Sequence, residues 1–238
     1  MIFKYYHGTS SIFLNSIQEH GLGGINPNLD YKNLDVLRFL HKEAENWLTN
    51  NAEYLKVRAS TKAMATQGMI DVISPNGNQQ RCYFRHDRIY VALSKIRAII
   101  YASQTKYGSE IVTRCVLLYE LLKSENVDVE IPESINLFGI DKMSENKSEP
   151  ILIEISEIRD NDLNKEDGKT AKEALNLLRR LIPNMNEKEK FEFIQYCNFE
   201  LIKPVPIEKL KYYRLSTKGN PGTEQFKYEL FEIKNAKY

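Results

Sequence analysis

Short segments in which apolar residues alternate with other residues occur at widely separated places in this chain. Residues 2–6 form an apolar and aromatic segment, and the next extended segment spans residues 81–93. Further alternating segments follow at residues 151–155, 199–202 and 226–233. Such alternation is typical of strands with one buried face. These segments are strand candidates of the chain.

Helical periodicity fills most of the sequence between these segments. Apolar residues recur at intervals of three and four over residues 34–55, which predicts a helix. We expect Trp47, on this stripe, to pack in the core. Further helices are expected over residues 94–103, 170–182 and 186–197.

The fold class follows from the order of these elements. Residues 111–122 form an apolar run that favours a buried central strand, and Ser74–Gly77 reads Ser-Pro-Asn-Gly, a turn signal. The pattern predicts an α+β fold with mostly antiparallel strands. A length of 238 residues suits a single domain. Residues 25–85 would then be a helical insertion between the first two core strands.

Composition excludes several classes of protein. Lys plus Arg (33) nearly balances Asp plus Glu (32), so no broad basic field for nucleic acid is expected, although a local basic groove stays open. The three cysteines are widely spaced without a CxxC pair, which argues against a disulfide framework or a zinc site and suits the cytoplasm. Cys115 is expected in the core. We expect no signal peptide, no membrane span and no metal site.

The motif His7-Gly8-Thr9-Ser10 follows the first apolar segment and is expected to interrupt that strand. Thr9, Ser10 or Ser11 can cap the helix that follows, and Gly21 is placed to end it. A strand, a tight turn and a helix in this order suit the presentation of side chains and backbone amides to a ligand. Taken alone, however, the motif is equally compatible with a simple capped helix start.

A second motif, IYVALSKIRAIIYA at residues 89–102, supplies a family resemblance. Together with His7-Gly8, it resembles the ADP-ribosyltransferase superfamily, in which a strand with Tyr is followed by a small residue and by Ser and Lys opening a helix with a second Tyr. The resemblance is to the His-Tyr-Glu branch, which contains the poly-ADP-ribose polymerases and diphtheria toxin. It covers residues 2–22, 88–120 and 196–214 and does not explain residues 25–85.

The resemblance implies a split β-sheet flanked by helices, and NAD as the co-substrate. It implies that His7 bonds the adenosine-side ribose and that the backbone of Gly8 bonds the nicotinamide amide. Tyr90 and Tyr101 would sandwich the nicotinamide ring, and Ser94 would bond its carboxamide. The full set of NAD-binding residues implied is His7, Gly8, Thr9, Tyr90, Ala92, Ser94 and Tyr101.

A carboxylate completes this chemistry. Cleavage of the bond between nicotinamide and ribose builds positive charge on the sugar, which a nearby carboxylate can stabilise. Glu200 stands where the family places its catalytic glutamate, and Asn198 shares its strand face; Glu154 and Glu229 are alternatives. The implied catalytic residues are therefore His7, Tyr90 and Glu200. They would release nicotinamide and transfer ADP-ribose to a macromolecular acceptor, a protein or a nucleic acid.

Three other functions remain open at this point. An RNA 2′-phosphotransferase shares the fold and uses NAD, and it needs cationic residues that read a phosphate; Arg81, Arg85, His86 and Arg88 are candidates. A degenerate family member would bind NAD or ADP-ribose without turnover. An interaction domain would work through the helical insertion and would not bind NAD.

Overall fold

A computed structural model of the chain describes residues 2–73, 79–221, 223 and 225–234, with the backbone alone at residues 72–73 and 80–83. These residues form an α+β protein with an open antiparallel sheet. The chain divides into two compact units. Unit 1 comprises Met1–Ile25, Arg88–Ser109 and Ser148–Tyr238, and unit 2 comprises Asn26–Asp87 and Glu110–Lys147.

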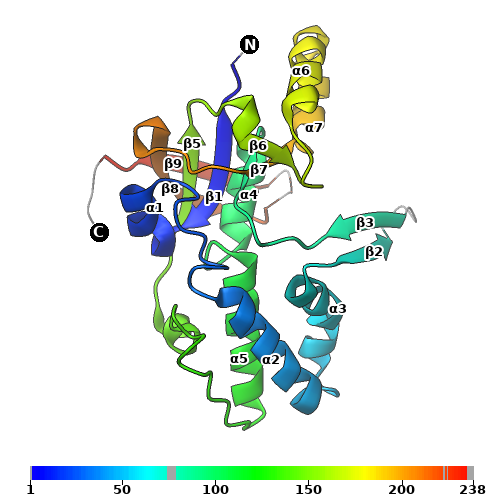
Figure 1. Cartoon of the computed structure of the whole chain (residues 1–238), viewed down its shortest axis with the longest axis vertical. Coiled ribbons are helices and arrows are strands. Elements are labelled where there is room, and N and C mark those ends of the chain that lie inside the picture. Colours follow the sequence, from blue (N-terminus) through cyan, green and yellow to red (C-terminus); the bar gives the residue numbers. More distant parts are fainter. Residues whose placement is uncertain (1, 74–78, 222, 224, 235–238) are drawn as a thin grey trace. The chain divides into compact units, whose positions relative to one another are not determined.

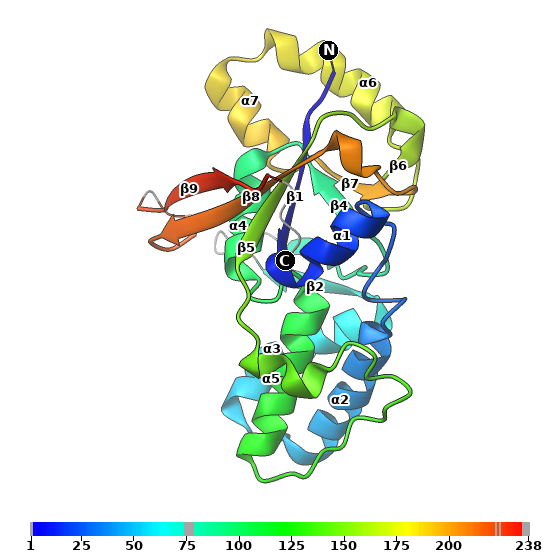
Figure 2. The ribbon, with the colours of Figure 1, turned by 90° about the vertical axis from the view of Figure 1, so that its left-hand side faces the viewer.

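The described part of unit 1 contains a seven-stranded sheet in the order β6-β7-β4-β1-β5-β8-β9 (Figures 1 and 2). Every neighbouring pair in it is antiparallel. The strands are β1 (Tyr5–Ser10), β4 (Tyr90–Ala92), β5 (Pro150–Ile155), β6 (Leu163–Lys165), β7 (Asn198–Leu201), β8 (Leu210–Lys218) and β9 (Lys227–Glu232). Strand β1 therefore lies between strands that follow it by many residues.

Helix α4 (Lys95–Gln104) packs on this sheet and contributes to its core. Its residues Ala98, Ile99 and Ala102 form a buried cluster with Leu152 of β5 and Leu215 of β8. The other helices of unit 1 are α1 (Leu14–His20), α6 (Lys172–Leu181) and α7 (Glu187–Ile194) and the 3-10 helices η1 (Ser11–Phe13), η3 (Asp160–Asp162), η4 (Ile182–Asn184) and η5 (Ile207–Lys209). The sheet and α4 thus bury a shared apolar layer.

Unit 2 is mainly helical. Buried residues of α2 and α5, among them Leu37, Leu40 and Leu118, fill its interior, and Cys115 lies there as predicted. A separate two-stranded ribbon, β2-β3, accompanies the helices. The elements are α2 (Asn33–Trp47), α3 (Ala52–Thr66), β2 (Met69–Ile73), β3 (Gln79–Tyr83), α5 (Glu110–Ser124) and the 3-10 helix η2 (Ile140–Glu145). The expected turn at Ser74–Gly77 lies outside the described residues.

The predicted central strand at residues 111–122 is wrong, because this segment lies within helix α5. Ile111, Cys115, Leu118 and Leu122 are all fully buried. Their spacing of four, three and four residues is the stripe of a helix with one buried face. The apolar density of the segment suggested a strand, but this stripe is helical. Unit 2 accordingly joins residues of the expected insertion to residues that sequence analysis assigned to the sheet.

Two expectations about residues 34–55 are also wrong. The segment forms two helices, and the side chain of Asn51 caps the second by accepting hydrogen bonds from the backbone N–H groups of Glu53 and Tyr54. Trp47 is 61% exposed. The buried stripe continues from Ala44 to Leu48, and Trp47 projects beside it rather than along it.

The motif at residues 7–10 does not interrupt the first strand, since β1 runs from Tyr5 to Ser10. Ser10 precedes η1 without a side-chain capping bond. Gly21, with φ of 78°, does end α1 as predicted. The motif therefore lies within the sheet, and its glycine serves a purpose other than a turn.

Candidate functional site

The register of β4 and β7 brings Tyr90 and Glu200 directly opposite each other. The N–H of Leu201 donates to the carbonyl of Ile89 (2.9 Å), and the N–H of Leu93 donates to that of Cys197 (3.0 Å). The pair Tyr90–Glu200 lies between these hydrogen-bonded positions. In antiparallel strands such a pair brings its Cα atoms to about 4.5 Å, closer than the hydrogen-bonded pairs. The two side chains therefore lie side by side on one face of the sheet.

Strand β6 extends this row with a polar residue. Asn164 pairs with Glu200 from the side opposite Tyr90. Asn198, two residues before Glu200, pairs with Ala92 and projects from the same face. Across the strands, Glu200 is therefore bordered by the aromatic ring of Tyr90 and the amide of Asn164. Both groups can contact a flat polar ligand.

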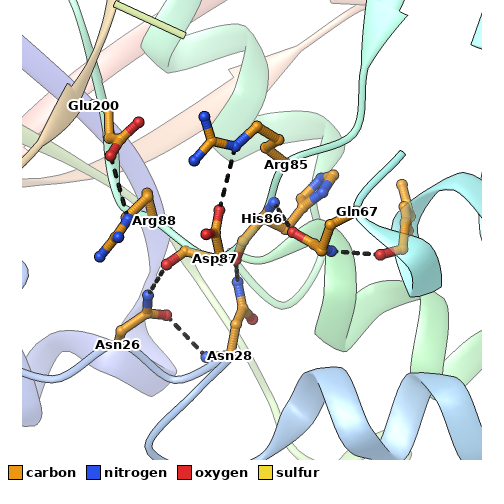
Figure 3. Close-up of polar contacts among 9 residues, drawn as sticks. Asn26, Asn28, Gln67, Arg85, His86, Asp87, Arg88 and Glu200 are labelled. Carbon is orange, nitrogen blue, oxygen red and sulfur yellow. Dashed lines mark hydrogen bonds and ion pairs between the residues drawn. The ribbon is translucent and has the colours of Figure 1, made fainter. Parts of the chain in front are cut away.

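Glu200 is a buried carboxylate with a cation beside it. Its side chain is 5% exposed, and Oε1 lies 3.2 Å from Nε of Arg88 (Figure 3). The Arg88 side chain is 50% exposed. Burial disfavours the ionised form of a carboxyl group, whereas a nearby guanidinium favours it. The ion pair therefore supplies charge compensation at a place where solvent supplies little.

His7 contacts the same strand through the backbone. Its Nδ1 donates a hydrogen bond of 2.7 Å to the carbonyl oxygen of Tyr90. Backbone groups of successive strand residues alternate between the two neighbours. Because those of Ile89 and Leu93 bond β7, the carbonyl of Tyr90 points towards β1. In the described residues β1 and β4 pair at one position, Tyr6 with Ala92. Beyond this pair the strands diverge, and the His7 imidazole donates to the Tyr90 carbonyl in place of a backbone N–H of β1.

This hydrogen bond determines what the other ring nitrogen can do. With the proton on Nδ1, Nε2 of a neutral His7 carries a lone pair and is an acceptor. Burial lowers the pKa of His7, and the bond to the Tyr90 carbonyl opposes this effect in part. The neutral form is therefore favoured, and Nε2 can accept a hydrogen bond from a hydroxyl group.

The side chains of His7 and Tyr90 leave the sheet on opposite faces. Tyr6 pairs with Ala92 and so shares the face of Tyr90, and His7, the next residue, points to the other face. The two residues meet through an imidazole-to-carbonyl bond at the junction of β1 and β4. The structure thus brings together strands that carry His7, Tyr90 and Glu200, in the order β1, β4, β7.

Gly8 is required by the packing of α4 on β1. A Cβ atom at this position would lie 2.2 Å from the carbonyl oxygen of Ala98 and 3.0 Å from the backbone nitrogen of Ala102. Tyr101 precedes Ala102 on this helix and is partly buried, and Thr9 is buried in β1. Close helix–strand packing thus explains the glycine that sequence analysis placed against nicotinamide.

Ser94 is the N-cap of α4. From the sequence, Ser94 was expected to bond the nicotinamide carboxamide, and this capping role was not predicted. Its Oγ accepts a hydrogen bond from the N–H of Arg97 (3.2 Å) and donates to Oε1 of Gln195 (2.9 Å). Ala92 is buried beside it in β4. A ligand carboxamide could bond Ser94 only by replacing one of these two contacts.

The cationic residues before β4 have acidic partners, and Figure 3 shows those of Arg85 and Arg88. Nε of Arg85 lies 3.7 Å from Oδ1 of Asp87, and Nε2 of His86 lies 2.6 Å from Oε2 of Glu110. With the Arg88–Glu200 pair, three members of the expected phosphate-reading cluster face carboxylates. The side chain of Arg81 lies outside the described part of the chain.

Two asparagines that sequence analysis did not single out fix the backbone of this segment. Nδ2 of Asn26 donates to the carbonyl of Asp87 (2.8 Å), and Nδ2 of Asn28 donates to that of His86 (2.6 Å). No local pattern identifies these contacts, because they join residues about 60 positions apart. They hold the chain immediately before Arg88.

The alternative glutamates lie elsewhere on the sheet. Oε1 of Glu154, on β5, is 2.9 Å from Nζ of Lys4. Glu229 is exposed on β9, at an edge of the sheet. Of the three candidates, Glu200 is the one whose strand pairs with that of Tyr90.

Comparison with known proteins adds no relative. No protein-family model matches the chain, and neither a curated protein nor a solved structure gives a significant match. Within the described ranges, no group of three or more His, Cys, Asp and Glu residues is arranged to hold a metal ion. No helix in the same residues has the length and apolar character needed to cross a membrane.

Proposed function

We propose that the chain is an NAD-dependent ADP-ribosyltransferase of the His-Tyr-Glu branch. The observation that carries this proposal is the direct pairing of Tyr90 with a buried Glu200 on adjacent strands. His7 is bonded to the carbonyl of Tyr90. The three residues named by the motif, although far apart in the sequence, belong to three consecutive strands of one sheet. The junction where β1 and β4 part would be the split of an ADP-ribosyltransferase-like sheet.

The residues fit the chemistry of NAD cleavage. Glu200 would hold its negative charge near the ribose and stabilise the positive charge that develops as nicotinamide leaves. Nε2 of His7 lies on the sheet face opposite Tyr90 and Glu200, so it would accept a hydrogen bond from a ribose hydroxyl where NAD passes the junction at which β1 and β4 part. Tyr90 would offer an aromatic face to the nicotinamide ring. ADP-ribose would then pass to a macromolecular acceptor.

The other residues expected to bind NAD have less support from the structure. Thr9, Ala92 and Tyr101 lie on β1, β4 and α4 next to the residues above. Gly8 and Ser94 serve packing and helix capping. We therefore assign NAD recognition first to His7 and Tyr90.

The test is nicotinamide release from NAD by the wild type and by Glu200→Gln, which keeps the size of the side chain and removes its charge. We expect a loss of about 100-fold or more, since this is the usual effect of removing one electrostatic contact to a transition state. Glu229→Gln, at the exposed edge strand, is the matched control and should retain activity. A Glu200→Gln variant as active as the parent would refute the assignment.

The same measurements separate the alternatives. A non-catalytic module would be stabilised against heat by NAD and would release no nicotinamide, and an interaction domain would show neither effect. An RNA 2′-phosphotransferase would consume 2′-phosphorylated RNA. This last function has less support, because Arg85, His86 and Arg88 pair with carboxylates.

A further inference from the structure

We propose that Arg88 is a positioning residue that holds Glu200 ionised and correctly oriented for the reaction. The inference rests on the proposed function and extends it to a residue that the family motif does not contain. Its basis is the short separation between Nε of Arg88 and Oε1 of Glu200, 3.2 Å, at a carboxylate that is 5% exposed.

Burial alone would work against a catalytic carboxylate. Full burial can raise the pKa of a carboxyl group by up to about 3–5 units, so that the group is neutral near pH 7. A protonated Glu200 could not stabilise a developing positive charge. An opposite charge within about 4–6 Å lowers such a pKa by about 1–3 units. Arg88 therefore acts in the direction that the chemistry requires.

The cross-strand partners of Glu200 are uncharged and do not share the role of this cation. Across the strands Glu200 faces the Tyr90 phenol on β4 and the Asn164 amide on β6, and Asn198 shares its face of β7. A phenol and an amide can donate hydrogen bonds but carry no positive charge at neutral pH. Arg88 lies within ion-pair distance and supplies that charge.

Arg88 is also held in place by its chain neighbours. The carbonyl of Asp87, before it, accepts the hydrogen bond from Asn26, and the carbonyl of Ile89, after it, accepts from the N–H of Leu201. Arg88 lies two residues before β4, and its ion pair places the guanidinium beside Glu200, which shares a sheet face with Tyr90. Anchoring on both sides limits the freedom of the backbone that carries Arg88, and the burial of Glu200 distinguishes this ion pair from a typical surface pair, which contributes little.

The experiment compares Arg88→Met, which keeps an unbranched stem without charge, with the conservative Arg88→Lys. The Glu200 carboxyl is titrated by carbon NMR, its signal being assigned by its loss in Glu200→Gln. Nicotinamide release is followed against pH. In Arg88→Met we expect the Glu200 pKa to rise by about 1–3 units, and the acid limb of kcat to move up by the same amount.

The kinetic constants provide a second readout. In Arg88→Met, kcat near neutral pH should fall about 10-fold or more, KM should change little, and activity should return at higher pH. Arg88→Lys should restore most of the wild-type profile. Lys203→Met removes a cation just beyond β7 whose Nζ lies 3.7 Å from Oδ1 of Asp162. It is the matched control and should leave both the titration and the pH profile unchanged.

The outcomes separate this inference from the proposed function. If the wild type is active and Arg88→Met changes neither the Glu200 titration nor the pH profile, the role of Arg88 is overturned. The proposed function would then stand. A wild type that releases no nicotinamide would overturn the proposed function. A shifted titration in such a protein would leave Arg88 as a structural partner of Glu200, and the positioning role would fall with the reaction.

Discussion

Units 1 and 2 each contain an arginine–glutamate pair, and the two pairs differ in their surroundings. In unit 2, Glu45 is 33% exposed and takes two hydrogen bonds from Arg58, Nε at 2.8 Å and Nη2 at 2.5 Å, as well as one from the Tyr54 hydroxyl. In unit 1, Glu200 is 5% exposed, and its Oε1 lies 3.2 Å from Nε of Arg88. The first arrangement fastens two helices, and the second keeps a buried charge on a sheet face.

The difference shows that the same residue types form a partly exposed pair in one unit and a pair with a buried carboxylate in the other. The donors from Arg58 and Tyr54 lower the pKa of Glu45 to about 2, so its negative charge is committed to contacts within unit 2. Glu200 stands beside Tyr90 in a row of side chains from β4, β7 and β6. Under the proposed function, this carboxylate would stabilise a transient positive charge on the substrate.

The largest expected effect of a substitution is that of Gly8→Val in unit 1. The added Cβ would meet backbone atoms of α4, which cannot move aside as a side chain would. We expect a loss of about 3 kcal/mol or more in the free energy of unfolding, measured with urea. Gly139→Ala in unit 2 is the control. Its Cβ would meet nothing within 4 Å, so it should cost only about 1 kcal/mol for its positive φ. Equal losses would show that α4 does not pack so closely.

Glu45→Gln should lower the stability of unit 2 by about 1–3 kcal/mol at neutral pH, because hydrogen bonds to a charged group are lost. Nicotinamide release should be unchanged. The pKa of Glu45 is lowered on folding, so its contribution is present above the ordinary value of 4.5 and is lost as the pH falls towards about 2. Thermal unfolding of both proteins against pH checks this. A gap that widens on acidification would contradict the pairing.

The loss of stability of unit 1 as the pH falls should depend on His7. Burial lowers the pKa of His7 on folding, so the unfolded chain binds a proton more readily and stability falls as the pH decreases below about 6.5. The loss is at most about 1.4 kcal/mol for each unit of difference between the two pKa values. His7→Gln should therefore lose less stability than the wild type between about pH 7.5 and 5.5. His41→Gln, at another histidine whose pKa burial lowers, tests the same effect in unit 2.

Trp47→Gln should have the smallest effect, a change below about 0.5 kcal/mol, because the side chain is 61% exposed. The chain has one tryptophan, so its fluorescence reports on this site alone and should be quenched readily by acrylamide. Leu48→Ala, at the buried neighbour, should cost about 2–5 kcal/mol. Protection of Trp47 from the quencher would place it in a contact.

The elements predicted correctly from the sequence were those marked by local residue patterns. Alternation predicted β5, β7 and β9 to within about two residues, and helical periodicity over residues 94–103 predicted α4. These patterns work because they depend on neighbours along the chain. Strand β8 was not predicted, and α5 was taken for a strand. Its apolar run suited either element, and the partner helix α2 that fixes its buried face comes from much earlier in the chain.

The sequence by itself determined the α+β class and identified His7, Tyr90 and Glu200 as candidates, because residue type and order along the chain carry that information. Only the tertiary structure decided that Tyr90 faces Glu200, that His7 bonds a backbone carbonyl and that Arg88 lies beside the buried Glu200 carboxylate. Cross-strand register is set by the packing of whole elements, and a shift of one residue would turn every side chain to the other face. Contacts between residues far apart in the chain therefore follow from the folded sheet.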